Sequence, residues 1–105
     1  MATEIKTETF DSFVKTPDKA VLIDFWATSC GPCRMLSPIV EAVAEEKADS
    51  LVVGKVNVDD CPELAQRFGV MSIPTLLLFR DGELVDKSIG YMPKAELEKL
   101  VEKAL

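Results

Sequence analysis

The sequence contains no histidine and only three cysteines. Structural zinc sites use four Cys or His ligands, commonly arranged as two pairs. Cys30 and Cys33 form one such pair, whereas Cys61 stands alone. This shortage of ligands argues against a metal site, and we expect none.

Clustered basic residues are also missing. The 12 Lys and Arg are outnumbered by 18 Asp and Glu, the formal net charge is −6, and the acidic residues are spread along the chain. Binding to phosphate backbones or to anionic lipid surfaces requires clustered positive charge. The charge balance therefore disfavours nucleic acids and membrane surfaces as partners.

Long apolar runs are absent. The longest, AVLIDFWA at residues 20–27, is too short to span a bilayer and contains Asp24. The opening residues, MATEIKTET, lack the apolar region of a signal peptide. We therefore expect a cytoplasmic protein. Structural disulfides seldom persist in that reducing compartment, which weakens the interpretation of the cysteine pair as a structural staple.

No linker, repeat or low-complexity segment divides the chain, and its 105 residues suit one domain over 1–105. Segments with strand and helix patterns alternate in the order β-α-β-α-β-α-β-β-α. The expected strands lie at Ile5 and at residues 20–27, 51–58, 75–79 and 84–89. With right-handed crossovers, this order predicts an α/β sandwich of three layers whose first three strands are parallel.

Local signals predict where several elements begin. Thr7 or Thr9 is placed to cap a helix at residues 10–14, and Asp59 or Asp60 to cap a helix that starts near Pro62. The last helix is expected to begin at about Lys94. An Asp-Gly pair within residues 80–83 predicts a hairpin turn.

Cys30 and Cys33 lie where a strand ends and a helix begins, a position that open α/β sheets use for chemistry. The positive end of the helix dipole should lower the pKa of Cys30. Gly31 permits close approach of another chain, and Pro32 loses no hydrogen bond in a first helical turn. A Cys-x-x-Cys pair at such a junction indicates a redox-active dithiol.

Three segments resemble the thioredoxin family: DFWATSCGPC at residues 24–33, SIPT at 72–75, and the RDGE turn followed by Gly90. The resemblance runs essentially end to end. It implies the thioredoxin fold, a three-layer α/β/α sandwich with a five-stranded mixed sheet in the order 1-3-2-4-5 and four helices.

The same resemblance implies a protein disulfide reductase. Its substrates would be disulfide-containing proteins, and a thioredoxin reductase, dependent on either NADPH or ferredoxin, would recharge it. The redox centre would be a Cys30–Cys33 disulfide that opens to a dithiol. The sequence has no GxGxxG fingerprint, so we expect no bound cofactor, and we expect a monomer.

The resemblance also implies roles for single residues. Cys30 would be the nucleophile, Cys33 the resolving thiol, and Asp24 the proton acceptor for Cys33. Asp24 interrupts an apolar strand, so burial should raise its pKa. An ion pair with Lys55 on the neighbouring strand is the structural alternative, and the two roles are compatible. Trp26 would lie beneath the active site or serve as a core aromatic.

Substrate contacts are implied for Ile73, Pro74 and Gly90. In the family the bond before this proline is cis and packs against the dithiol, and the preceding residue pairs with the substrate backbone. From the sequence alone, cis is the minority isomer, and a strand-initiating trans proline is the alternative for Pro74. Glycine at position 90 allows the partner backbone to come close.

Two residues depart from the expected pattern. Ser29 stands where the family usually has Trp, which removes an apolar ring from the rim of the site. The change either weakens partner docking or lets the hydroxyl stabilise the Cys30 thiolate. Cys61 is read either as an inert thiol or as a regulatory one that forms mixed disulfides under oxidation.

Two other classes of function are alternatives to a reductase. An oxidase or isomerase of the same fold typically carries His between the cysteines, where this chain has Gly31 and Pro32. A non-catalytic binding module would use the surface around Gly31, Ile73 and Gly90 to hold a partner. Such a module has no need of the cysteines, and this chain keeps both.

Overall fold

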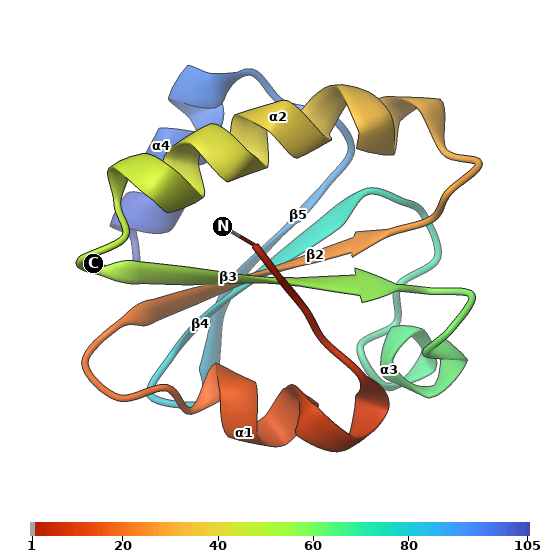
Figure 1. The fold of residues 1–105 in the computed structure, drawn as a ribbon, viewed down its shortest axis with the longest axis horizontal. Helices are drawn as coiled ribbons and strands as arrows, with labels where there is room; N and C mark the ends of the chain where they lie inside the picture. The colour runs from red at the N-terminus through yellow and green to blue at the C-terminus, as the bar shows by residue number, and fades with distance from the viewer. Residues whose placement is uncertain (1) are drawn as a thin grey trace.

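A five-stranded mixed sheet forms the middle layer of the computed structural model, which describes residues 2–105 (Figure 1). Its strands are β1 (Thr3–Glu4), β2 (Ala20–Trp26), β3 (Leu51–Asn57), β4 (Thr75–Arg80) and β5 (Glu83–Ile89). They are ordered β1-β3-β2-β4-β5: β1, β3 and β2 are parallel, β4 is antiparallel to β2, and β5 is antiparallel to β4. This topology confirms the predicted fold.

Helices cover both faces of the sheet (Figure 1). The longer helices α2 (Gly31–Glu46) and α4 (Lys94–Glu102) lie on one face, whereas α1 (Phe10–Val14) and α3 (Pro62–Arg67) lie on the other. A 3-10 turn, η1 (Thr7–Thr9), leads into α1. Each face has its own cluster of buried apolar side chains, so the sheet is sandwiched between two hydrophobic cores.

Strand β2 is central and its side chains alternate between the two cores. Ala20 and Leu22 belong to the core under α2 and α4, and Val21, Ile23 and Phe25 belong to the core on the other side. Successive side chains of a strand point to opposite faces. Asp24 therefore points to the α2 side, which places a carboxyl group in an apolar layer beneath that helix.

The two expected helix caps have different outcomes. Thr9 is the N-cap of α1, but its hydroxyl donates to the Lys6 carbonyl instead of capping the helix. The N-cap of α3 is Cys61, not Asp59 or Asp60. The backbone N–H groups of Asp60 and Cys61 both donate to Asn57 O. The two aspartates therefore belong to a turn that follows β3 and precedes the helix.

The other boundaries agree with the predicted ones to within one residue, and α4 begins at Lys94 as predicted. Strand β1 ends at Glu4, although the Ile5 N–H still donates to Lys55 O at 2.8 Å. The Asp-Gly hairpin is confirmed, since β4 and β5 are joined by Asp81 and Gly82 with φ of 54° and 80°. Both angles are in the left-handed region that such two-residue turns require.

Candidate active site

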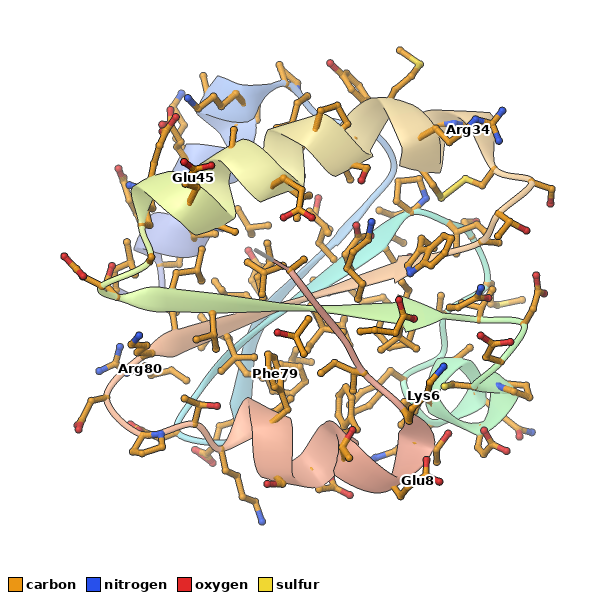
Figure 2. The ribbon with its side chains drawn as sticks, viewed as in Figure 1. Lys6, Glu8, Arg34, Glu45, Phe79 and Arg80 are labelled. Carbon is orange, nitrogen blue, oxygen red and sulfur yellow. A yellow bond between two sulfur atoms is a disulfide. The ribbon has the colours of Figure 1, made fainter. Side chains whose placement is uncertain are left out.

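Cys30 and Cys33 are joined by a disulfide at the start of α2, with 5.2 Å between their Cα atoms. Figure 2 shows the disulfide as a yellow bond close to Arg34. Cys30 is half-buried and Cys33 is only 4% exposed. Cys30 is the N-cap of α2, and its Sγ accepts a hydrogen bond from the Cys33 N–H at 3.1 Å. An N–H aimed at this sulfur favours a negative charge on it.

The two residues between the cysteines leave the approach to the disulfide open. Pro32 lies in the first turn of α2 and is exposed. A Cβ added at Gly31 would meet no atom within 4 Å, and the backbone of Gly31 lies outside the left-handed region. The fold itself therefore does not require a glycine at this position.

The loop before β4 packs against the dithiol. The Ile73–Pro74 peptide bond is cis, the isomer that the resemblance implies. Ile73 O lies 3.8 Å from the Cys30 Sγ. Gly90 is tied to the same loop, because its N–H donates to Pro74 O at 2.8 Å, and its φ of 95° suits glycine. A Cβ at Gly90 would meet nothing within 4 Å.

Asp24 is buried beneath this site, with 1% of its surface exposed. Its Oδ1 has no hydrogen-bond partner among residues 2–105. Burial raises the pKa of Asp24 to about 6, against an opposing effect of the Lys55 charge. A carboxyl group with such a pKa exchanges protons near neutral pH.

Lys55 lies beside Asp24 in the sheet register but forms no direct ion pair with it in the described residues. The direct ion pair, which was the structural alternative for Asp24, is therefore not formed among these residues. The Lys55 Nζ instead donates to Ser37 Oγ at 3.1 Å and lies 5.1 Å from the centroid of the Trp26 ring. The aromatic face and the hydroxyl compete with Asp24 for the ammonium group.

A cavity of about 220 Å³ adjoins the buried cysteine. Its lining consists of Trp26, Ala27, Thr28, Cys33, Arg34, Ser37 and Lys55. The buried Trp26 Nε1 has no hydrogen-bond partner in the described part of the chain. A cavity of this size has room for several water molecules, each of which needs about 30 Å³. Trp26 therefore lies in the wall of the site rather than deep in the core.

Ser37 is a residue of this cavity that the sequence pattern does not single out. It lies four residues after Cys33 on α2, and residues at that spacing share one face of a helix. This spacing is the signal that could have identified it. Its partner Lys55 comes from β3, so the contact depends on how the helix sits on the sheet.

The two departures from the family pattern lie in different surroundings. Ser29 is exposed, and no hydrogen bond joins its hydroxyl to Cys30 among the described residues. Cys61 is 2% exposed, and its Sγ lies 3.8 Å from Ile5 O. Burial keeps the Cys61 thiol away from other proteins in the folded state.

Residues 2–105 contain no group of three or more His, Cys, Asp or Glu side chains placed to hold a metal ion. None of the helices in this part of the chain has both the length and the apolar character to cross a bilayer.

Comparisons with known proteins agree with this site. The family model Thioredoxin matches residues 1–103. A thioredoxin of Listeria monocytogenes is 50% identical over 103 residues, which cover 98% of both chains. A thioredoxin of Alicyclobacillus acidocaldarius is 57% identical over 81 residues, 77% of each chain. One of Bacillus subtilis is 48% identical over 91 residues, 87% of this chain and 88% of its own. The chain belongs to the thioredoxin family of protein disulfide oxidoreductases, and its Cys30–Cys33 pair serves dithiol–disulfide exchange.

Proposed function

We propose that the protein reduces disulfides in other proteins, with Cys30 as the nucleophile and Cys33 as the resolving thiol. The observation that carries this proposal is the unequal exposure of the two linked cysteines at the start of α2. The half-buried Cys30 can meet a substrate disulfide, whereas the buried Cys33 can reach only Cys30.

The exchange takes place in two steps. The Cys30 thiolate attacks one sulfur of the substrate disulfide, and the other substrate sulfur leaves as a thiolate. Cys33 then loses its proton and attacks the Cys30 Sγ, which releases the second substrate sulfur. Two electrons pass to the substrate, which ends as a dithiol, and the protein ends with the Cys30–Cys33 disulfide.

Asp24 accepts the proton of Cys33 in the second step. Its pKa of about 6 lets the carboxylate form near neutral pH and still bind a proton. The cavity that Cys33 shares with Lys55 and Trp26 has room for a water molecule to carry the proton. Gly31 and Pro32 leave the approach to the disulfide unobstructed, and Trp26 lines the cavity next to Cys33.

The substrate chain lies along Ile73 and Gly90. The half-buried Ile73 of the cis-Pro74 loop lies next to Cys30, a position that suits pairing with an extended backbone. Met71, which is 95% exposed, and the exposed Tyr91 flank this stretch and offer apolar contacts. The surface therefore favours unfolded or extended segments that carry a disulfide.

The protein works as a monomer in the cytoplasm, and a thioredoxin reductase returns it to the dithiol form. The reducing cytoplasm is the compartment where such a donor is needed. The named relatives support the assignment of a reductase partner.

Trapping the intermediate tests the order of the two cysteines. A Cys33→Ser variant should accumulate a mixed disulfide with a substrate protein through Cys30, visible by mass spectrometry. Cys30→Ser, the matched control, should form none. A mixed disulfide that forms through Cys33 in the Cys30→Ser variant, at the rate of the other variant, would overturn the assignment.

A further inference from the structure

The contact between Ser37 and Lys55 has no part in the exchange reaction as proposed above. Ser37 is half-buried, and its Oγ accepts the hydrogen bond from Lys55 Nζ at 3.1 Å. Both side chains line the cavity of about 220 Å³ that also contacts Cys33. Because Ser37 follows Cys33 by one helical turn, a single face of α2 presents both the resolving cysteine and the hydroxyl.

The ammonium group of Lys55 could extend into water instead of staying in the cavity. Lysine side chains commonly extend their ammonium groups into water and bury only the aliphatic stem. Lys55 is half-buried at the open cavity, yet its Nζ stays over the Trp26 ring, 5.1 Å from the centroid. Ser37 is the hydrogen-bond partner that residues 2–105 offer to this ammonium group.

We propose that Ser37 is a positioning residue for disulfide exchange: its hydroxyl holds the Lys55 ammonium inside the cavity, where the charge acts on Asp24. Asp24 and Lys55 are direct neighbours in the register of β2 and β3 and lie on the α2 side of the sheet. The helix therefore sets the distance between the two charges through one serine.

Other groups around Asp24 leave Lys55 as the main source of opposing charge. On α2, Arg34 turns its Nη1 to Thr28 O at 2.9 Å, and Glu41 binds the Ala2 N–H at 2.9 Å while lying within electrostatic range of Lys55. The β4 neighbour of Asp24 is the apolar Leu76. On β1, the carboxyl-bearing Glu4 is the register neighbour of Lys55, and Cys33 contributes a thiol to the cavity in the reduced protein.

The contact between Ser37 and Lys55 should change the pKa of Asp24 in one direction only. Lys55 lowers the pKa of Asp24 against the larger effect of burial. Without the Ser37 hydroxyl, the ammonium group moves toward water, and the carboxylate loses part of its stabilisation. The pKa of Asp24 should then rise, so that a smaller fraction of the carboxylate is available at neutral pH.

The test compares Ser37→Ala, Lys55→Met, the double variant, and Ser37→Thr as the conservative control that keeps a hydroxyl. The direct readout is the titration of Asp24 in each protein, followed by NMR of its side-chain carboxyl carbon. We expect Ser37→Ala to raise the titration midpoint by about 0.5–1 pH unit, a part of the roughly 1–3 units that a nearby opposite charge contributes. Ser37→Thr should stay near the unsubstituted protein.

The double variant shows whether Ser37 affects Asp24 through Lys55 or only through the packing of α2. If Ser37 acts through Lys55, Ser37→Ala should have little further effect in the Lys55→Met background. An Asp24 midpoint that Ser37→Ala leaves unchanged or lowers overturns the proposal. A shift that persists in full without Lys55 overturns it as well.

The effect on catalysis rests on the proposed role of Asp24, and a second readout tests that role separately. The rate of Cys33 attack on a preformed mixed disulfide, measured against pH, should follow the Asp24 midpoint in each variant. If Asp24→Asn leaves this pH profile unchanged, the role of Asp24 as proton acceptor fails. The NMR titration still decides whether Ser37 positions Lys55.

Discussion

The helices α2 and α3 begin alike: each has a cysteine at the N-cap and a proline in its first turn, and each follows a parallel strand. Their cysteines nevertheless differ in almost every other respect. Cys30 is half-buried, its Sγ accepts an N–H, and Cys33 lies one turn away. Cys61 is buried, its Sγ faces the Ile5 carbonyl oxygen, and it has no disulfide partner within residues 2–105.

This difference shows what a cysteine at a helix start needs in order to exchange disulfides. The dipole of the helix is common to both positions and cannot by itself account for the chemistry. The start of α2 adds a second thiol, access for a partner, and a buried carboxyl group at Asp24. The start of α3 has the exposed Asp59 and Asp60 beside it, and its own cysteine is buried.

Removing each sulfur in turn should give the largest contrast. Cys30→Ser should lower the reduction of a protein disulfide by at least roughly 1000-fold, because a serine hydroxyl is not a nucleophile without an activating base. Cys61→Ser, the control, should retain the rate of the unsubstituted protein. A loss of activity in Cys61→Ser while the protein remains folded would break the comparison.

Alkylation should separate the two helix starts by reactivity. In the reduced protein, iodoacetamide should modify Cys30 at least about 100-fold faster than Cys61, because the thiolate is the reactive form and the buried thiol reacts only after local opening. Peptide mapping by mass spectrometry measures both rates in one sample. Comparable rates would mean that burial of Cys61 does not protect it.

The buried carboxyl group should make stability depend on pH. Because the native pKa of Asp24, about 6, lies above the ordinary 3.8, the group costs no stability below pH 3.8, and the cost grows until the pH passes 6. A difference of about 2 pKa units corresponds to roughly 3 kcal/mol. Asp24→Asn should thus stabilise the oxidised protein by about that amount near pH 7.5 and by roughly 0.5 kcal/mol or less near pH 4.

Urea unfolding at the two pH values measures this effect, and Asp59→Asn is the matched control. Asp59 is exposed at the start of α3, so its substitution should change stability by about 0.5 kcal/mol or less at either pH. An equal gain for Asp24→Asn at both pH values would contradict the assignment of a raised pKa.

The smallest effect concerns Gly31. A methyl group there meets no atom within 4 Å, and the backbone is not left-handed, so Gly31→Ala should stabilise the protein by about 0.4–1 kcal/mol. If partners approach at Gly31 as we propose, the same methyl group should raise KM for a protein substrate. Gly90→Ala, at φ 95°, should instead destabilise the fold. An unchanged KM for Gly31→Ala would show that partners do not approach this residue.

Much of the fold follows from local patterns in the sequence. The apolar run of β2, interrupted only by Asp24, predicts a central strand with a buried carboxyl group, and both are present. The Asp81–Gly82 turn is equally well defined, because few residues adopt its backbone angles. These features depend on residues close together in the chain.

What could not be predicted depends on packing between distant segments. The cap of α3 is Cys61 because the turn after Asn57 takes up the preceding aspartates. Lys55 binds Ser37 rather than Asp24 because α2 brings a hydroxyl within reach above the sheet. The choice of Lys55 between these two partners depends on how α2 packs on the sheet, which residue spacing alone does not determine.

The reduction potential of the Cys30–Cys33 couple tests the central claim most directly. It can be measured by equilibrating the protein with a thiol redox buffer and trapping the free thiols, with Cys61→Ser used to remove the third thiol. A protein disulfide reductase should give a value near that of thioredoxin, about −270 mV. A value near that of protein disulfide isomerase, about −180 mV, would contradict the account and indicate a protein adapted to oxidation or exchange.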